Sequence, residues 1–561
     1  MIHPRKAGFP TGNALLWLLP LAFLALFFFL PLGKILAYAA GSAVKNGFTL
    51  TSLAPVWRPL WFTTWQAGLS TVLTLLLGMP AAYVFAHYRF RGKNLLRVLT
   101  TLPFILPTVV AVAGFTALLG PRGLLNLGLM RLFQLDTAPI TFMNTLWGIL
   151  LVHVFYNTTI VLRVVGSAWA QLDERWEQTA RVLGASPRQT LREVTLPLLR
   201  PSILAAALLV FLFDFTSFAV ILMVGGPYFA TLEVAIYQQT MSLFNLPLAG
   251  LLAVVQLVCT FAITWVYGNV NGRRNIPLLP KLTSETLRDV RSFGERLAVF
   301  GINTLLITLL VLPMLALVAR SLLNLGADGV MRFSTQNYTQ LFVNSSNSYF
   351  YVPPAGAALN SLFYALVTVL LSLVLGTLAA YAMSRGQRLQ GLLSALITLP
   401  LGASAVTLGL GFLVTFTHAP LDVSHFPLLI PIAHSLVAMP FVVRTLQPAL
   451  NAIPVSLRQA AGVLGASSMK TWRNVDVPLL RRPLLVGGIF AFTLSLGEFG
   501  ATTFLARPET PTLPVAIARY IGMPGELNYG QALAMSTILL LICGLAIFLL
   551  ERLQPAGMTE I

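Results

Sequence analysis

Apolar segments of about 20 residues recur along the whole chain, and they constrain its fold more than any other feature. Such a segment is long enough to cross the hydrocarbon core of a bilayer as a helix. Hydrophobic residues make up 57% of the 561 residues and charged residues only 10%, a composition that excludes a set of soluble domains. The segments are continuous runs rich in Leu, whereas barrel strands are about ten residues long and alternate in polarity. The sequence therefore predicts an all-α polytopic membrane protein.

About twelve of these segments are predicted to be membrane helices. They cover residues 14–37, 64–86, 99–119, 144–165, 202–224, 248–268, 297–322, 359–383, 393–417, 426–447, 484–505 and 532–550. The first follows Arg5 and Lys6 and has some features of a signal peptide. It is long, lacks a small-residue cleavage site and is followed by many more spans, so we expect a membrane helix there too.

The basic residues indicate the topology. Lys and Arg outnumber Asp and Glu by 36 to 18, which gives a formal net charge of +18. Most basic residues outside the predicted helices fall in alternate connecting segments, for example Arg89, Arg91, Lys93 and Arg97 after the second helix. This asymmetry follows the positive-inside rule and predicts that these segments and both chain ends are cytoplasmic. The charge thus reports topology and a surface facing anionic lipid, and no nucleic-acid partner is expected.

The chain also matches itself at an offset of 281 residues, about half its length. The matched residues include His153 and His434, Arg163 and Arg444, Phe218 and Phe499, and the runs 197–200 and 478–481. Upstream the offset is 298, where Gly78 and Tyr83 correspond to Gly376 and Tyr381. The connection after the third helix must therefore be longer in the first half.

The repeat divides the chain into two halves of six predicted helices each. We expect residues 1–268 to form the first half, residues 269–296 a cytoplasmic linker, and residues 297–561 the second half. Six is an even number, so the chain returns to its starting side after each half. The halves are then parallel repeats related by an axis along the membrane normal.

The best repeated stretch lies in the predicted cytoplasmic loop between helices 4 and 5, and again between helices 10 and 11. The first copy reads Gln178-Thr179-Ala180, three residues, Gly184, nine residues, Val194, one residue and Leu196-Pro197. The second copy reads Gln459-Ala460-Ala461, Gly465, Val475 and Val477-Pro478 at the same spacing. Apolar residues at helical spacing before each glycine predict two short helices joined at a left-handed glycine, a rigid knob.

This pattern resembles the EAA loop of binding-protein-dependent ABC import permeases, which reads Glu-Ala-Ala, three residues, Gly, nine residues, a branched apolar residue, one residue and Leu-Pro. Gln178 and Gln459 stand where that family usually has Glu, Thr179 replaces the first Ala, and Val477 replaces Leu. As a whole, the chain resembles a fused, double-length permease of the type I importer fold, similar to the thiamine and ferric-iron importer permeases.

The resemblance implies the transmembrane permease subunit of an ABC importer, a multi-pass protein of the bacterial inner membrane. An extracytoplasmic binding protein would deliver a small solute, thiamine or ferric iron, and ABC ATPase subunits, most simply a homodimer, would dock on the two loops. The sequence has no G-x-x-x-x-G-K-[ST] phosphate loop, so ATP hydrolysis is expected on a separate subunit. We therefore predict no enzymatic activity, cofactor or metal site in this chain.

Three alternatives remain at this point. The repeated loops would also suit amphipathic helices lying on the inner membrane surface. A secondary transporter driven by an ion gradient would show inverted repeats or a relay of membrane carboxylates, and no docking loops. A polytopic membrane enzyme would need a catalytic cluster at the membrane face.

Two carboxylates, Asp214 and Glu498, fall inside predicted helices, where an unpartnered charge costs several kcal/mol. At the 281 offset Asp214 corresponds to Ser495, and Glu498 corresponds to Ser217. These four residues are expected to line the translocation path, where the acids would suit a cationic cargo. Hydrogen bonds between helices are the alternative for the acids and the expectation for the histidines 153 and 434.

Short helices are expected after spans 5 and 11, at residues 231–237 and 512–517. The first follows a Gly225-Gly226-Pro227 turn signal. In the resembling family such segments form the outer gate and the seat of the binding protein. Interfacial helices with no such role are the alternative.

Overall fold

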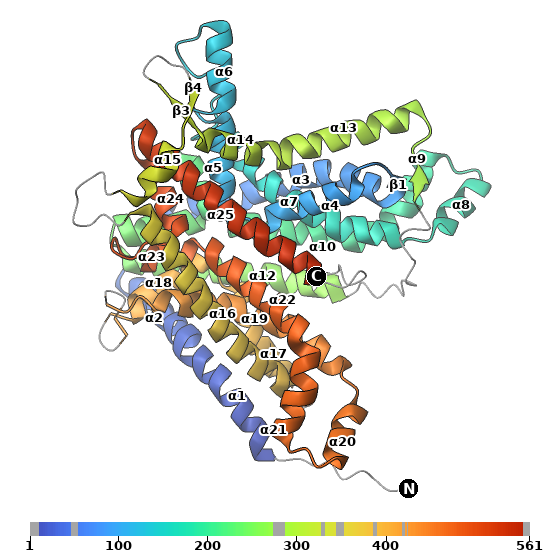
Figure 1. The fold of residues 1–561 in the computed structure, drawn as a ribbon, viewed down its shortest axis with the longest axis vertical. Coiled ribbons are helices and arrows are strands. Elements are labelled where there is room, and N and C mark those ends of the chain that lie inside the picture. Colours follow the sequence, from blue (N-terminus) through green and yellow to red (C-terminus); the bar gives the residue numbers. More distant parts are fainter. Residues whose placement is uncertain are drawn as a thin grey trace.

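The computed structural model describes residues 10–46, 54–272, 287–326, 331–343, 353–384, 390–417, 421–422 and 425–553. Most of this part of the chain is helical (Figure 1). Within it, eleven helices are long and apolar enough to cross a membrane, or twelve if the bent pair Leu393–Gly402 and Ala405–Thr415 is one span. The prediction of an all-α protein with about twelve membrane helices is confirmed. The linker residues 273–286 and both chain ends lie outside the described residues.

Three helices form the packed centre of each half. They are α3 (Ala54–His87), α7 (Leu146–Gln171) and α10 (Leu196–Phe215) in the first half, and α16 (Pro354–Ser384), α19 (Leu429–Ala452) and α22 (Val477–Gly497) in the second. A Cβ at Gly78 would lie 2.7 Å from Val161, and a Cβ at Gly376 would lie 2.7 Å from Val442. These two pairs correspond in the sequence repeat, so the same close helix approach through a glycine occurs in both halves.

The first span of each half packs against helices of both halves. Helices α1 (Pro10–Leu24) and α2 (Leu30–Asn46) contact α16, α18 (Ala405–Thr415) and α12 (Leu246–Gly272). Helices α13 (Phe293–Leu310) and α14 (Leu312–Ser321) contact α3, α5 (Thr108–Leu119) and α25 (Glu526–Leu553). Figure 1 shows α1 beside α16, and α13 along the first half. The first span of each half therefore joins the two halves.

The third predicted span of each half is broken into two helices, and in the first half the helix long enough to cross a membrane is Thr108–Phe133, so the predicted span 99–119 begins and ends too early. Residues 99–119, predicted as one helix, belong to α4 (Lys93–Ile105) and α5, which are separated at Pro107. In the second half, α17 (Gln390–Thr398) continues as a 3-10 turn to Gly402, and the helix Leu393–Gly402 meets α18 at a bend of 98°. Proline explains the first break because it lacks the N–H that a continuous helix needs. After α5, the longer connection of the first half contains α6 (Leu124–Phe133), which projects from one end of the molecule (Figure 1).

Strands are short in the described part of the chain. β3 (Leu323–Leu325) and β4 (Met331–Phe333) form an antiparallel hairpin after α14. β1 (Tyr88–Arg89) pairs in parallel with β2 (Arg288–Asp289), so the end of the linker is attached to the first half. Beside this pairing the Lys93 ammonium donates to the Tyr88 carbonyl at 2.8 Å. Burial, with Arg97 and Arg89 nearby, lowers the pKa of Lys93 to about 8.

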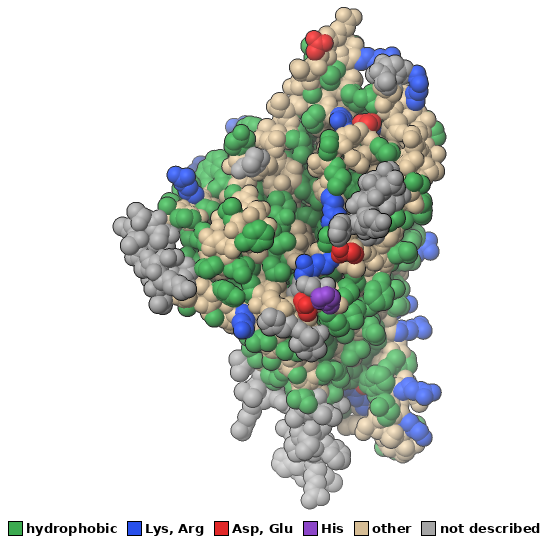
Figure 2. Space-filling view, turned by 90° about the vertical axis from the view of Figure 1, so that its left-hand side faces the viewer, with side chains coloured by type: hydrophobic (Ala, Val, Ile, Leu, Met, Phe, Trp, Pro, Cys, Tyr) green, Lys and Arg blue, Asp and Glu red, His purple; other side chains and the backbone are tan. Residues whose placement is uncertain are grey.

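The surface is suited to lipid. Figure 2 shows hydrophobic side chains over much of the face that it displays. Leu18, Trp57 and Leu76 are each more than half exposed, although they lie in membrane-length helices. Large exposed apolar areas are unfavourable in water and ordinary in a bilayer.

Candidate functional site

The first repeated loop forms two short helices at an angle. α8 (Glu174–Val182) is followed by Gly184, whose φ of +91° is a left-handed conformation that suits glycine. The Ala185 N–H donates to the Ala180 carbonyl at 3.0 Å and closes the helix end. α9 (Pro187–Thr190) then begins at a capping box formed by Ser186 and Gln189.

The second loop repeats this geometry. α20 (Val455–Val463) is followed by Gly465 with a φ of +79°, and the Ala466 N–H donates to the Ala461 carbonyl at 2.9 Å. α21 (Ser468–Thr471) begins at Ser467, whose side chain accepts from the Lys470 N–H. The predicted arrangement of helix, glycine and helix is therefore present in both copies. We call these two segments, residues 173–190 and 454–471, the coupling loops.

Each coupling loop carries an exposed apolar pair at its tip. Val182 and Leu183 are 86% and 82% exposed, and Val463 and Leu464 are 88% and 86% exposed. We call these two pairs the apolar tips. The motif residues Gln178, Thr179, Gln459 and Ala460 are exposed beside them, whereas Ala180 and Ala461 are half-buried. Apolar side chains at the end of a projecting, rigid helix pair are typical of a protein-protein contact.

The chain runs from each coupling loop into the membrane without leaving helical conformation. The candidate spans are Pro187–Phe215 and Ser468–Gly497, so the predicted spans 202–224 and 484–505 begin and end too late. Each span contains a π-helical turn, Leu191–Thr195 or Trp472–Asp476, before α10 or α22. Pro197 and Pro478 directly follow these π-helical turns, at the second residue of α10 and α22, where proline removes an N–H that a regular helix would use. Motion of a loop is thereby connected directly to a membrane helix.

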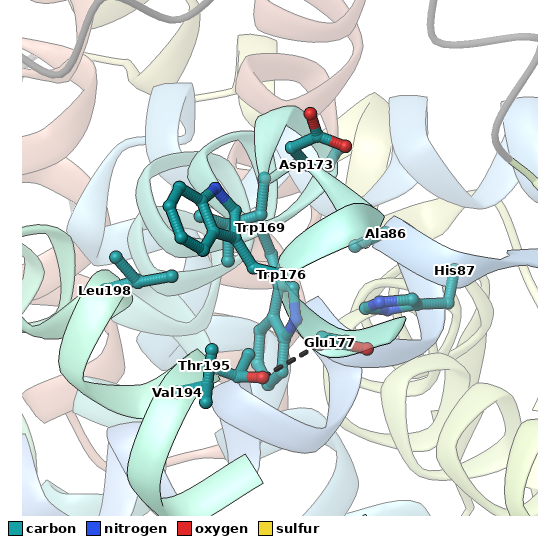
Figure 3. A pocket seen from close by; sticks show the side chains of 11 residues that line it. Ala86, His87, Trp169, Asp173, Trp176, Glu177, Val194, Thr195 and Leu198 are labelled. Atoms are coloured by element: carbon teal, nitrogen blue, oxygen red, sulfur yellow. Dashed lines mark hydrogen bonds between the residues drawn. The ribbon is translucent and has the colours of Figure 1, made fainter. Parts of the chain in front are cut away.

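Side-chain contacts also link each loop to the start of its membrane helix. In the first half, the Thr195 hydroxyl donates to Glu177 Oε1 at 2.8 Å. Figure 3 shows this bond beside a hollow behind α8 that Trp169 and Trp176 help to line. In the second half, the equivalent residues Arg458 and Asp476 form an ion pair at 2.9 Å.

The first membrane acid, Asp214, is buried between helices of the first half. Its carboxylate accepts from Asn157 Nδ2 at 2.6 Å and lies 3.4 Å from His153 Nδ1. The other ring nitrogen of His153 lies 2.8 Å from the Ser217 hydroxyl. Gln66 donates to the Asp214 carbonyl at 2.9 Å. Polar contacts therefore join side chains of α3, α7 and α10 at this depth.

The second acid, Glu498, caps a helix. It follows α22 and accepts from the N–H groups of Ala501 and Thr502, at 2.8 and 3.0 Å, at the start of α23 (Gly500–Leu505). His434 Nε2 lies 3.1 Å from this carboxylate, and His434 Nδ1 lies 2.8 Å from the Ser495 hydroxyl. A carboxylate at a helix N-terminus satisfies N–H groups that have no partner within the helix.

The two acids thus occupy equivalent clusters with exchanged positions. In each half a histidine contacts one serine and one carboxylate, but Asp214 stands where the second half has Ser495, and Glu498 stands where the first half has Ser217. The predicted helix-helix hydrogen bonds of the histidines are confirmed. Both carboxylates are buried. Glu498 accepts hydrogen bonds on both oxygens, whereas Asp214 accepts from Asn157 on Oδ1 and has no hydrogen bond to Oδ2 among the described residues.

An aromatic contact joins the halves beside these clusters. The rings of Phe218 and Phe499, which correspond in the sequence repeat, stack with centroids 5.6 Å apart and an interplanar angle of 26°. Tyr237 contacts Phe218 at 5.5 Å and Phe504 at 5.7 Å. Equivalent residues can touch each other only near the axis that relates the two halves. This cluster therefore lies between the halves at that depth.

The short helices predicted after spans 5 and 11 are present as α11 (Leu232–Tyr237) and α24 (Leu513–Gly522). Each is anchored by a hydroxyl of the long helix of its half. Thr63 accepts from the Leu232 N–H at 2.9 Å, and Ser361 accepts from the Leu513 N–H at 2.7 Å. α24 lies at the end of the bundle away from the coupling loops (Figure 1).

Comparison with known proteins agrees with this geometry. The family described as "Binding-protein-dependent transport system inner membrane component" matches residues 74–276 and 372–557. The chain belongs to this family: it is a membrane component of a binding-protein-dependent transport system, present as two fused copies.

Its relatives include permeases of thiamine transport systems. The thiamine transport system permease protein ThiP of Brucella abortus (strain 2308) is 29% identical over 90% of this chain and 89% of its own length. ThiP of Escherichia coli (strain K12) is 28% identical over 89% of both chains. A probable ABC transporter permease protein, y4fN of Sinorhizobium fredii, is 26% identical over 82% of this chain and 81% of its own.

Sequence reasoning missed the contacts that hold the coupling loops in place. Glu177 of the first loop lies 18 residues before its partner Thr195, and Arg458 of the second loop lies 18 residues before Asp476, a separation beyond the reach of a helical pattern. One signal was available. Glu177 and Thr195 of the first copy are replaced by Arg458 and Asp476 in the second, and residues in contact often change together.

Proposed function

We propose that this chain is the permease subunit of an ATP-driven importer for thiamine. The observation that carries the proposal is the pair of coupling loops, each continuous with a membrane helix and each ending in an exposed apolar tip. Thiamine as the cargo is supported by the relatives of nearly full length, several of which are described as thiamine permeases. Ferric iron is the second cargo predicted from sequence, and none of the relatives reported above is described as an iron permease.

The apolar tips are the proposed docking points for ATPase subunits. Two equivalent loops on one chain call for two equivalent partners, so a homodimer is the simplest match. An amphipathic helix seated in a groove of the ATPase transmits motion without chemistry of its own. Gln178 and Gln459 lie beside the tips and complete this contact, while Gly184 and Gly465 fix its shape.

The coupling loops face the cytoplasm in this proposal. The segment after the second span and the end of the linker, which are rich in arginine, pair through β1 and β2. Positively charged connections favour the cytoplasmic side. α11 and α24 then lie toward the outside, where the binding protein delivers its solute.

In this proposal, the structure represents a state that is closed on the outer side. Phe218, Phe499, Tyr237 and Phe504 fill the space between the halves near α11. At the other end α8 and α20 lie far from each other (Figure 1). We propose that ATP binding draws the coupling loops together, separates Phe218 from Phe499 and admits the solute.

Co-purification tests the docking. Leu183→Asp and Leu464→Asp place a charge on the exposed tips, so each is expected to reduce the ATPase bound per permease, and the double variant to abolish binding. The amount of permease in the membrane should stay unchanged because neither side chain is packed in the bundle. ATPase bound at wild-type yield to the double variant would refute docking at the apolar tips.

A further inference from the structure

The hollow behind α8 that Figure 3 shows has a lining that docking of an ATPase does not explain. It lies between α3, α7, α8 and the start of α10, and its volume is about 440 Å³ with the open mouth included. Two indole rings, one imidazole ring and two carboxylates line it, from Trp169, Trp176, His87, Asp173 and Glu177. The described residues of this lining include no Lys or Arg. The hollow is therefore aromatic and acidic, in a chain with a net charge of +18.

The Glu177 carboxylate provides negative charge at the hollow. It is half-buried, and its Oε1 accepts from the Thr195 hydroxyl at 2.8 Å. Within the described part of the chain it forms no ion pair. A half-buried carboxylate attracts a cation more strongly than one in bulk water, because its surroundings screen the charge less.

The two indoles provide a surface that suits an organic cation. Trp169 is 6% exposed, and its ring contacts those of Tyr83 and His87 with centroids 5.3 and 5.8 Å apart. Trp176 is 62% exposed on α8. The face of an indole attracts cations. Trp169 Nε1 is also buried without a hydrogen-bond partner among the described residues, so an acceptor atom on a ligand would satisfy it.

The second half does not repeat these groups, although it repeats the coupling loop. The residues at the 281 offset from the two tryptophans and the two carboxylates carry no aromatic ring and no negative charge. They are Leu450, Leu457, Pro454 and Arg458. The glycine, the helix pair and the apolar tip occur in both loops and serve docking. Groups that only the first loop carries indicate a separate function.

We propose that the hollow behind α8 is a binding site for an organic cation, and that this cation is thiamine on the cytoplasmic side. The identity of the ligand rests on the proposed function. Thiamine carries a positively charged thiazolium ring, which suits the indoles and Glu177. It also carries nitrogen and oxygen atoms that can accept from Trp169 Nε1.

A ligand in this hollow holds α8 against the bundle. The lining groups come from four elements, so a displacement of α8 relative to α7 and α10 changes the distances between them. A ligand stabilises the conformation that it binds best. In the present conformation α8 and α20 lie far from each other (Figure 1). The bound cation therefore opposes the approach of the coupling loops, and thiamine that accumulates inside slows its own uptake.

Titration calorimetry on the purified permease without ATPase tests the binding site. Thiamine should bind, and Glu177→Gln should weaken binding about tenfold, because Gln keeps an oxygen for Thr195 but loses the charge. Trp176→Leu introduces the residue of the second half and should weaken binding about fivefold, whereas Trp176→Phe keeps an aromatic ring and should lose less. Thermal unfolding of each variant shows whether the permease remains folded.

A neighbouring acid supplies the matched control. Glu193 is exposed on the π-helical turn and does not line the hollow. Glu193→Gln removes the same charge from the same segment and should change the affinity less than about twofold. Choline should also bind, and its uncharged carbon isostere should not, because the site recognises the cation. Equal affinities in the wild type, Glu177→Gln and Trp176→Leu would overturn the site.

Transport in proteoliposomes tests the effect on α8. The complete complex imports labelled thiamine, while unlabelled thiamine is added on the coupling-loop side. The rate should fall at least about fivefold in the wild type and less than about twofold in Glu177→Gln and Trp176→Leu, each relative to its own rate without added thiamine. Equal inhibition in all three proteins would overturn the restraint of α8 by a ligand in the hollow.

Failure of the site and failure of the proposed function give different results. If the chain imports another solute, the complex does not transport thiamine, yet choline still binds to the permease alone and binds less tightly to Glu177→Gln. If the complex transports thiamine but neither thiamine nor choline binds to the permease alone, the site is overturned while the proposed function stands.

Discussion

Replacing Gly465 by Ala is expected to weaken ATPase binding without unfolding the bundle. A Cβ at this position meets nothing within 4 Å, so the whole cost comes from the backbone φ of +79°. A residue other than glycine pays about 1–2 kcal/mol in this region. That free energy lowers the population of the loop's native geometry about 5- to 30-fold relative to its alternatives. ATPase affinity for the second loop should fall by a similar factor.

A glycine three residues earlier supplies the matched control. Gly462 lies inside α20, and a Cβ there also meets nothing within 4 Å. Gly462→Ala should leave binding unchanged or improve it, since Ala in a helix is favoured over Gly by about 0.5–1 kcal/mol. Gly465→Asn should lose less affinity than Gly465→Ala because Asn tolerates the left-handed region.

The assay is a titration of purified permease with ATPase in detergent, with thermal unfolding of the permease measured in parallel. Gly184→Ala in the first loop should behave as Gly465→Ala does, because its φ is +91° and its surroundings are also open. Wild-type affinity in both glycine variants, or an equal loss in Gly462→Ala, would refute the argument that the left-handed glycine shapes the docking site.

The other predictions concern the gate, the acids and the topology. Cysteines at 218 and 499 joined by a short bifunctional reagent should block transport while ATPase remains bound; continued transport would exclude separation of these residues as a required step. Asp214→Asn and Glu498→Gln should lower the unfolding temperature, at a cost of about 1–3 kcal/mol for each weakened buried hydrogen-bond set. Lost transport at an unchanged unfolding temperature would instead place both acids on the path. A reporter fused after Arg97 or Arg291 should be cytoplasmic, and one after Pro227 or Pro508 outside; a cytoplasmic signal from Pro227 would show that an odd number of spans has been miscounted.

The membrane spans were predictable because bilayer thickness imposes one length on every apolar helix. The bounds of spans 5 and 11 could not be predicted in this way. The observed helices begin at Pro187 and Ser468, where Arg192 and Lys470 interrupt the apolar run although the backbone stays helical. A helix that continues past the bilayer carries no hydropathy signal at its start. The shape of the coupling loops was predictable because a left-handed glycine ends a helix through contacts with the last helical turn alone.

The partners of polar side chains depend on tertiary structure and could not be predicted in the same way. His153 and Asp214 lie 61 residues apart, and Phe218 meets Phe499 only because the two halves face each other. The crossing of α1 and α13 to the opposite half was also hidden, since either half offers the same apolar surface to an apolar helix. The sequence repeat predicted that His153 and His434 are equivalent, but it did not predict which side chains each histidine contacts.

The source of energy for uptake tests the central claim most directly. Labelled thiamine uptake is measured in proteoliposomes that contain the permease and its ATPase, with the binding protein on the side opposite the coupling loops. The account predicts uptake that requires ATP on the coupling-loop side and the binding protein on the other, persists without an ion gradient, and is lost in the Leu183→Asp, Leu464→Asp double variant. Uptake driven by a proton or sodium gradient in the absence of ATP, and retained in that variant, would contradict it.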